Sequence, residues 1–258
     1  MGRVISYNNR ILTYGTRIIE GAIAFDPSTI PNLQIWVKAD AGITLNKGGV
    51  SNWANQSNGG SDYDFIQTTA ASQPLYVLDG INGLPTLRFN GSTSTMYQLV
   101  SRSYAGGKLT FFVVMKIADA GILSILGSQL YERDIDGNGT IMYGLYGQAS
   151  GLCYVGYNYS GEQVPISNKL TIGQVYIISN KNVSGPGSFF YRNGTDIGSA
   201  FGSDANTFQN LGSTKFPSNT MGGFFNGDIS EILIYEKMLS DTEMSSVNKY
   251  LNSKYSAY

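Results

Sequence analysis

Three acidic side chains alternate with other residues in the segment YERDIDGNGTIMYG, residues 131–144. Glu132, Asp134 and Asp136 lie two positions apart, so a β-strand through this segment would aim all three carboxylates at one face of its sheet. Two carboxylates about 5–5.5 Å apart can serve as nucleophile and general acid in retaining glycoside hydrolysis. A carboxylate pair from this segment is therefore a candidate for cleavage of a glycan.

The same segment also contains the first half of a calcium-binding loop. The oxygens of Asp134, Asp136 and Asn138 have the spacing of the first ligands in a twelve-residue loop. The twelfth position of such a loop is normally a glutamate, but Leu145 stands there. The sequence DGNG is equally typical of a hairpin turn. Two interpretations therefore stay open, a structural turn and a calcium site; the sequence requires no cofactor, and calcium is the one it suggests.

The third candidate site is rich in tyrosine. Residues 143–163, YGLYGQASGLCYVGYNYSGEQ, contain five tyrosines among glycine, serine and asparagine. Tyrosine offers a broad contact area at low entropic cost, and its ring can stack on a sugar while its hydroxyl forms hydrogen bonds. Tyrosine is also an ordinary strand residue, so some of the five should face the core. The candidate ligand-binding residues are Tyr143, Tyr146, Tyr154, Tyr157 and Tyr159.

Several kinds of site are excluded by composition. The chain has no histidine, which excludes Ser-His-Asp and Cys-His nucleophiles and histidine-ligated zinc. Its single cysteine, Cys153, cannot form an intrachain disulfide and is expected to be a buried thiol. Seventeen Lys and Arg against eighteen Asp and Glu give a net charge of -1, which predicts no nucleic-acid partner. No apolar run approaches the ~20 residues that span a bilayer, so no membrane insertion is expected.

Short β-strands must position these candidate sites. Gly- and Asn-rich turns punctuate the middle of the chain every roughly 8–15 residues, and no helical periodicity lies between them. The segment LTFFVVMKI, residues 109–117, is apolar nearly throughout, as a central strand covered on both faces would be. This pattern predicts an all-β fold, a two-sheet antiparallel sandwich.

One helix is expected at the end of the chain, directly after the strand ISEILIY at residues 229–235. Ser240 and Glu243 have the spacing of a reciprocal capping box, which marks a helix start. Apolar residues then recur at three- and four-residue spacing in a single stripe. The stripe consists of Met244, Val247, Leu251 and Tyr255. The sequence therefore predicts a single amphipathic helix that packs on the sandwich.

Residues 31–255 resemble the concanavalin A-like, laminin-G-type jelly-roll modules of bacterial and bacteriophage surface proteins. The segments that carry the resemblance are PNLQIWVKADAGIT (31–44), VSNWANQSNGGSDYDF (50–65), INGLPTLRFNG (81–91), LTFFVVMKI (109–117), FYRNGTDIG (190–198) and the closing strand and helix (225–255). The resemblance implies a jelly roll of two packed antiparallel sheets and a binding or adhesion role without catalysis. The strand at Glu132 is also similar to the Glu-x-Asp-x-Glu strand of retaining β-glucanases, but its last carboxylate is the shorter aspartate.

The first thirty residues fall outside this resemblance and contain a seven-residue repeat, RVISYNN, RILTYGT and RIIEGAI. Each full unit is strand-like and ends in a two-residue polar turn, which predicts a three-stranded meander or a zigzag β-ribbon. Such a ribbon cannot bury its apolar residues alone, so it should dock on its own sandwich or on a partner chain. The candidate docking residues are Arg3, Ile5, Tyr7, Arg10, Ile11, Leu12, Tyr14, Arg17 and Ile18.

Together these features predict a docking arm at residues 1–30 and a jelly-roll domain at residues 31–258. The N-terminus MGRVISYNNR lacks the apolar core of a signal peptide. An anchored laminin-G-like module of this kind resembles decoration or fibre proteins on bacteriophage virions. The main hypothesis is a non-catalytic structural and recognition protein on the virion surface, whose partners are other virion proteins and cell-surface glycans, with a homo-oligomer as a further option.

Two alternatives remain open beside the virion hypothesis. One is a secreted bacterial carbohydrate-binding or adhesion module, which would be extracellular or on the bacterial cell surface. The other is a glycoside hydrolase that uses Glu132 and Asp136. Only two tryptophans occur, Trp36 and Trp53, and both belong to the laminin-G-like segments. The sequence therefore offers no tryptophan-lined sugar cleft to support the hydrolase.

Overall fold

The computed structural model describes the backbone of most of the chain and the side chains of its larger part. The described residues are 4–7, 10–13, 25–98, 109–118, 142–148, 152–159, 162–163, 169–183, 187–200, 215–216 and 225–258. Side chains are described for residues 25–98, 109–118, 170–181, 189–198 and 225–258.

The described elements are short strands, one α-helix and a few 3₁₀ turns. The first strands are β1 (Val4–Tyr7), β2 (Arg10–Thr13), β3 (Leu33–Lys38), β4 (Ile43–Asn46), β5 (Gly49–Trp53), β6 (Phe65–Ile66), β7 (Leu75–Ile81), β8 (Leu84–Asn90), β9 (Met96–Tyr97) and β10 (Leu109–Ile117). The later strands are β11 (Met142–Gln148), β12 (Leu152–Tyr159), β13 (Glu162–Gln163), β14 (Lys169–Leu170), β15 (Val175–Val183), β16 (Gly187–Arg192), β17 (Thr195–Ala200), β18 (Lys215–Phe216) and β19 (Asn226–Tyr235). The helix is α1 (Asp241–Tyr255), and the 3₁₀ turns are Pro27–Thr29, Ser61–Tyr63 and Ala70–Ser72.

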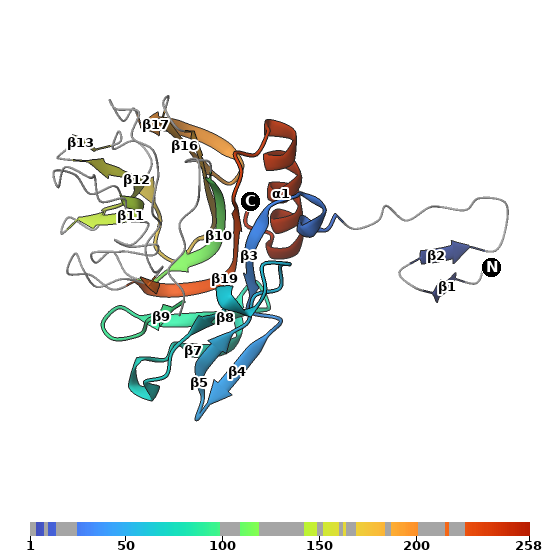
Figure 1. The fold of residues 1–258 in the computed structure, drawn as a ribbon, viewed down its shortest axis with the longest axis horizontal. Coiled ribbons are helices and arrows are strands. Elements are labelled where there is room, and N and C mark those ends of the chain that lie inside the picture. The colour runs from blue at the N-terminus through green and yellow to red at the C-terminus, as the bar shows by residue number, and fades with distance from the viewer. Residues whose placement is uncertain are drawn as a thin grey trace.

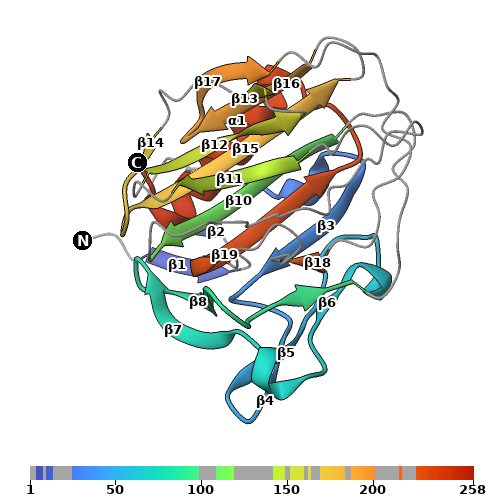
Figure 2. The same cartoon turned by 90° about the vertical axis from the view of Figure 1, so that its left-hand side faces the viewer.

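Apart from the two-stranded β1–β2 sheet, the strands form a large sheet and a small sheet, and every described strand pairing is antiparallel (Figures 1 and 2). The large sheet runs in the order β17-β16-β15-β10-β19-β8-β7-β5-β6-β9-β18, with β3 beside β19 and β4 beside β5. The small sheet consists of β11, β12, β13 and β14. The sequence prediction of an antiparallel jelly-roll sandwich with one C-terminal helix is therefore confirmed.

Strand β10 lies in the middle of the large sheet and is buried on both faces, as its apolar sequence predicts. Its residues alternate between two hydrophobic clusters: Phe111 and Val113 belong to one, and Phe112 and Val114 to the other. The second cluster also contains the apolar residues of α1. Figure 1 shows α1 on one side of this sheet and β11 and β12 on the other, so the fold has three layers.

Helix α1 begins with the predicted capping box. The Ser240 hydroxyl accepts a hydrogen bond from the Glu243 N–H, and the Glu243 carboxylate accepts one from the Ser240 N–H. The four residues of the predicted apolar stripe are all buried. The helix ends where Ser256 adopts the left-handed conformation, with φ of 48°. Among the described residues, no helix combines the length and the hydropathy that a membrane crossing would need.

A buried carboxylate joins α1 to the sheet beneath it. Glu231 on β19 accepts hydrogen bonds from Trp36 Nε1 at 2.6 Å and from the Tyr250 hydroxyl at 2.9 Å. The Tyr255 hydroxyl and Lys254 Nζ each donate to its other oxygen at 2.8 Å. Burial, together with the Glu231 charge, raises the pKa of both tyrosines far above the usual value. Two of the segments that carry the laminin-G-like resemblance, residues 31–44 and 225–255, therefore meet at one residue.

The loop after β5 is fixed by the side chain of Asn55. Its Oδ1 accepts from the Trp36 N–H at 2.8 Å, and its Nδ2 donates to the carbonyls of Gln34 and Gly60, each at 3.1 Å. Trp53 beside it is completely buried. Both tryptophans therefore serve the core and its neighbouring loop.

The first two units of the N-terminal repeat form β1 and β2, which pair as an antiparallel hairpin. The register pairs Val4 with Thr13 and Tyr7 with Arg10, in agreement with the predicted hairpin pairing of the first two units. Figure 1 draws this hairpin apart from the sandwich. Tyr14, Arg17 and Ile18 lie outside the described residues, and the docking of the arm stays a prediction.

Candidate functional site

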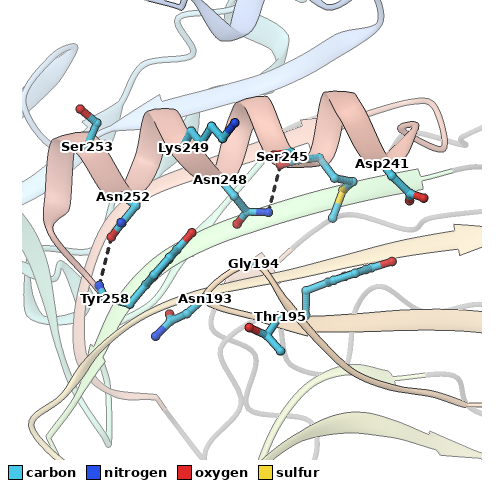
Figure 3. Close-up of a pocket in the computed structure, with 12 residues that line it drawn as sticks. Asn193, Gly194, Thr195, Asp241, Ser245, Asn248, Lys249, Asn252, Ser253 and Tyr258 are labelled. Carbon is cyan, nitrogen blue, oxygen red and sulfur yellow. Dashed lines mark hydrogen bonds between the residues drawn. The ribbon is translucent and has the colours of Figure 1, made fainter.

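A pocket lies between one side of α1 and the turn that joins β16 to β17 (Figure 3). Its volume of about 590 Å³ falls within the range of roughly 300–1,000 Å³ that small-molecule sites occupy. The strand side contributes Tyr191, Asn193, Gly194 and Thr195. The helix side contributes Asp241, Met244, Ser245, Asn248, Lys249, Asn252, Ser253 and Tyr258. Most of these residues carry amide or hydroxyl groups, so the lining is rich in neutral hydrogen-bonding groups.

The strand side of the pocket is a tight Asn-Gly turn. Asn193 and Gly194 have φ of 54° and 75°, and they join the cross-strand pair of Arg192 and Thr195. Two consecutive positive φ values are what a two-residue hairpin of this type requires, and Asn-Gly is its preferred sequence. The Asn193 side chain accepts a hydrogen bond from the Ile177 N–H at 2.9 Å, which fixes the turn to β15.

A side chain at position 194 would crowd the pocket. A Cβ at Gly194 would stand 3.1 Å from the Tyr258 hydroxyl and 3.7 Å from Asn248 Cγ. The turn therefore approaches both the last residue of the chain and the floor of the pocket closely. This approach brings residues from distant parts of the sequence around one space.

The helix side of the pocket is a polar stripe next to the apolar one. Residues at positions 241, 245, 248 and 252 follow the three- and four-residue spacing of one helix face. Asn252 Oδ1 accepts from the Tyr258 N–H at 3.0 Å, which holds the end of the chain against the helix (Figure 3). The Tyr258 ring remains 56% exposed. An aromatic face is thus available beside a row of amides.

Asn248 is the most buried amide of the lining, with only 5% of the residue exposed. Its Nδ2 donates to the Met244 carbonyl at 3.0 Å. Its Oδ1 is buried and accepts no hydrogen bond from any described residue. Figure 3 shows the side chain directed from α1 toward Gly194. A buried acceptor without a donor costs about 1–3 kcal/mol, so this group needs a reason for its presence.

The charges around the pocket are largely balanced. Lys181 Nζ lies 2.5 Å from Asp241 Oδ1, and this hydrogen bond lowers the pKa of the Asp241 carboxyl. Burial raises the pKa of the Tyr191 hydroxyl, although neighbouring Lys181 opposes that effect. Lys249 stands on the exposed side of the helix. The pocket therefore offers neutral amides, hydroxyls and two tyrosine rings rather than a concentration of one charge.

The predicted tyrosine site is described only in its backbone. The register of β11 and β12 pairs Tyr143 with Tyr157 and Tyr146 with Tyr154, and Tyr159 pairs with Glu162 of β13. Four of the five tyrosines are thus brought together in two cross-strand pairs. Their side chains lie outside the described residues, so a role in binding stays a prediction.

The acidic segment also stays a prediction. Glu132, Asp134, Asp136 and Asn138 lie outside the described residues, and neither the catalytic nor the calcium hypothesis is tested. Within the described part of the chain, no group of three or more Asp, Glu, Cys or His side chains could hold a metal ion.

The pocket itself was not predicted from the sequence. The sequence predicts Met244 as a core residue and residues 190–198 as part of a laminin-G-like segment, but no pattern relates the two. The polar stripe beside the apolar stripe of α1 was a readable signal. The strand turn that faces this stripe is determined by packing between segments that are distant in the sequence. No local pattern encodes that packing.

No protein-family model and no curated protein sequence matches the chain. Among solved structures, domain 4 of AbnA, a GH43 extracellular arabinanase from Geobacillus stearothermophilus in complex with arabinotriose, is similar, with a TM-score of 0.55 at 16% identity. The match covers 84% of this chain and 98% of that one.

Two further structures show the same likeness. Trypanosoma rangeli sialidase in complex with sialic acid has a TM-score of 0.52 at 12% identity, over 91% of this chain and 34% of the sialidase. The binding domain of Paraclostridial Mosquitocidal Protein 1 has a TM-score of 0.51 at 14% identity, over 85% of this chain and 52% of that one. This chain thus spans about a third of the sialidase and about half of the mosquitocidal binding domain. At these identities the likeness shows a common β-sandwich fold.

Proposed function

We propose that this chain is a non-catalytic carbohydrate-binding module, with the pocket between α1 and the β16–β17 turn as its sugar site. The observation that carries this proposal is the pocket's lining. Asparagine side chains can each donate and accept hydrogen bonds with neighbouring hydroxyls of a sugar. Tyr191 and Tyr258 add rings of the kind that stack on the apolar face of a sugar. A site of this composition favours binding through many neutral contacts.

The fold agrees with this proposal without determining it. The match to domain 4 of the arabinanase, which was solved with arabinotriose, covers 98% of that domain and 84% of this chain. Function resides in sites rather than in folds, so the likeness raises the expectation of sugar binding but does not place the sugar. The paired tyrosines of β11 and β12 are a second candidate face for the same ligand class.

The setting in which the module acts is a further part of the proposal. Carbohydrate binding without catalysis suits an adhesion protein outside the cell or on the bacterial surface. A component of a bacteriophage virion is the second candidate, and the observation that favours it is the β1–β2 hairpin built from an N-terminal repeat. None of the three structures named above is described as a virion protein, so this second candidate depends on the arm alone.

Glycan binding is tested with the full chain on an array that includes neutral, sialylated and uronic acid-containing glycans, followed by calorimetry with the best ligand. We expect binding that falls at least tenfold in Ser245→Trp, because an indole at this exposed position would fill the pocket. Thr242→Trp, also exposed on α1 but outside the lining, is the matched control and should bind as the unmodified chain does.

Two outcomes would count against the proposed function. Absence of binding to every glycan on the array would reject it. Equal binding by Ser245→Trp and the unmodified chain would move the site away from the pocket. The same glycans should release no reducing ends; release that disappears in Glu132→Gln would restore the hydrolase hypothesis.

A further inference from the structure

The floor of the pocket presents one hydrogen-bond acceptor with a specific requirement. Asn248 lies at the centre of the polar stripe of α1 and is 5% exposed. Its amide nitrogen donates one of its two N–H groups to the Met244 carbonyl, whereas its oxygen accepts no hydrogen bond from any described residue. An oxygen of this kind can be satisfied only by a donor, an O–H or an N–H group.

This requirement separates neutral sugars from acidic ones. A sugar hydroxyl can donate to Asn248 Oδ1 and accept from another lining amide at the same time. An ionised carboxylate carries acceptors only, so against Asn248 Oδ1 it would place oxygen against oxygen. The floor of the pocket therefore disfavours the charged group of a sialic or uronic acid.

The charged groups of the lining do not reverse this preference. The Asp241 carboxylate is bound to Lys181, so the positive charge of that lysine is already compensated. Lys249 is exposed on the helix, where solvent screens its attraction for an anion. An acidic sugar would gain little from these residues and would lose its carboxylate hydration on entering the pocket.

We infer that Asn248 selects a neutral sugar unit, by accepting a hydrogen bond from one of its ring hydroxyls through Oδ1. This inference rests on the proposed function and specifies its ligand class. Tyr258, which is 56% exposed and close to the Gly194 turn, presents a ring that can pack on the same sugar. Asn248 acts as a specificity-determining residue, through a buried oxygen in the pocket lining that no described residue satisfies.

The inference makes an unusual prediction for Asn248→Leu. Leucine has nearly the shape of asparagine and removes the buried acceptor, so the melting temperature should stay unchanged or rise. Sugar affinity should nevertheless fall at least tenfold. Asn180→Leu is the matched control, because Asn180 is also buried but its Nδ2 donates to the Phe189 carbonyl outside the pocket. We expect that control to lose stability and keep its affinity.

Ligand class is measured by calorimetry on the full chain with paired probes that differ in charge at one carbon. The probes are the methyl glycosides of glucose and galactose and those of glucuronic and galacturonic acid, together with arabinotriose and sialic acid. At least one neutral probe should bind, and each acidic partner should bind at least tenfold more weakly. The neutral affinity should change less than twofold between 50 and 500 mM salt.

The outcomes distinguish this inference from the proposed function. An acidic probe that binds as tightly as its neutral partner, in a manner blocked by Ser245→Trp, would overturn the inference and leave the sugar site in place. Unchanged affinity in Asn248→Leu would also overturn it. Binding of no probe of either class would reject both. Should Asn248→Leu fail to fold, the comparison of neutral and acidic probes on the unmodified chain still decides the matter.

Discussion

The Glu231 carboxylate is completely buried and accepts hydrogen bonds from Trp36, Tyr250, Tyr255 and Lys254. A buried carboxylate is costly unless a positive charge and hydrogen-bond donors surround it. Lys254 supplies the charge, and the three aromatic side chains supply neutral donors. These donors come from β3 and α1, so one anion on β19 ties the helix and a neighbouring strand to the large sheet.

Glu231→Gln tests this arrangement at the scale of the residue. The amide keeps the shape but removes the charge opposite Lys254 and turns a donor toward other donors. Breaking a buried pair in this way costs about 3–5 kcal/mol, so we expect a loss of that order in the free energy of unfolding in urea. Glu236→Gln, in the same segment but only partly buried, is the control and should change stability by less than about 0.5 kcal/mol. Equally small losses of unfolding free energy in the two variants would show that the Glu231 carboxylate does not hold α1 on the sheet.

At the scale of the element, α1 carries two adjacent stripes with different roles. The apolar stripe packs against the sheet and sets the distance of the helix from it. This stripe consists of Met244, Val247, Leu251 and Tyr255. The polar stripe beside them faces the β16–β17 turn and lines the pocket. Any change that unwinds the first turn of α1 therefore also displaces Asp241 and Met244 at one end of the pocket.

Ser240→Ala is predicted to fray this first turn. The variant removes the hydroxyl that accepts from the Glu243 N–H, and the loss of such a cap costs about 1 kcal/mol, within a range of roughly 0.5–2. We expect this decrease in urea unfolding, together with a modest loss of sugar affinity. Ser246→Ala is the control, because that serine lies inside the helix, where alanine is the better helix former. A control as destabilised as Ser240→Ala would argue against a specific role of the cap.

The helix and the central strand could be predicted from the sequence because their signals are local. A capping box spans four residues, and the burial of an apolar run such as 109–117 can be predicted from that run alone. The role proposed for Asn248 could not be predicted, because it depends on how α1 lies against the Asn193-Gly194 turn. In the same way, Trp36 and Glu231 were recognisable as parts of laminin-G-like segments, yet their hydrogen bond joins residues from opposite ends of the domain.

At the scale of the whole molecule, the hydrophobic core of the sandwich includes the end of the predicted arm, because Ile30 is a buried core residue. The core extends from Ile30 to Tyr255, and Phe25 packs on Tyr250 with ring centroids 6.4 Å apart. The first two repeat units pair with each other in β1 and β2. A two-stranded hairpin is only marginally stable alone, so a partner is expected to stabilise it.

Deletion of residues 2–24 should leave a soluble sandwich that melts cooperatively with little change in stability, while incorporation into its assembly is lost. Calorimetric melting measures the first effect and co-sedimentation with the parent assembly the second. Ile11→Asp combined with Ile18→Asp should reproduce the loss at full length, because each aspartate would bury an unpaired charge against the partner. A truncated chain that fails to fold would assign the arm to the core and remove the main support for a virion anchor.

The position of α1 has a consequence for how many ligands one chain can hold. The pocket beside α1 and the tyrosine pairs of β11 and β12 lie on opposite sides of the large sheet (Figure 1). Ligands at these two places would not compete for space. A chain in which both bind glycans would cross-link two sugar chains, and the resulting avidity could exceed either single affinity by orders of magnitude. Weak individual sites would then be sufficient for firm attachment.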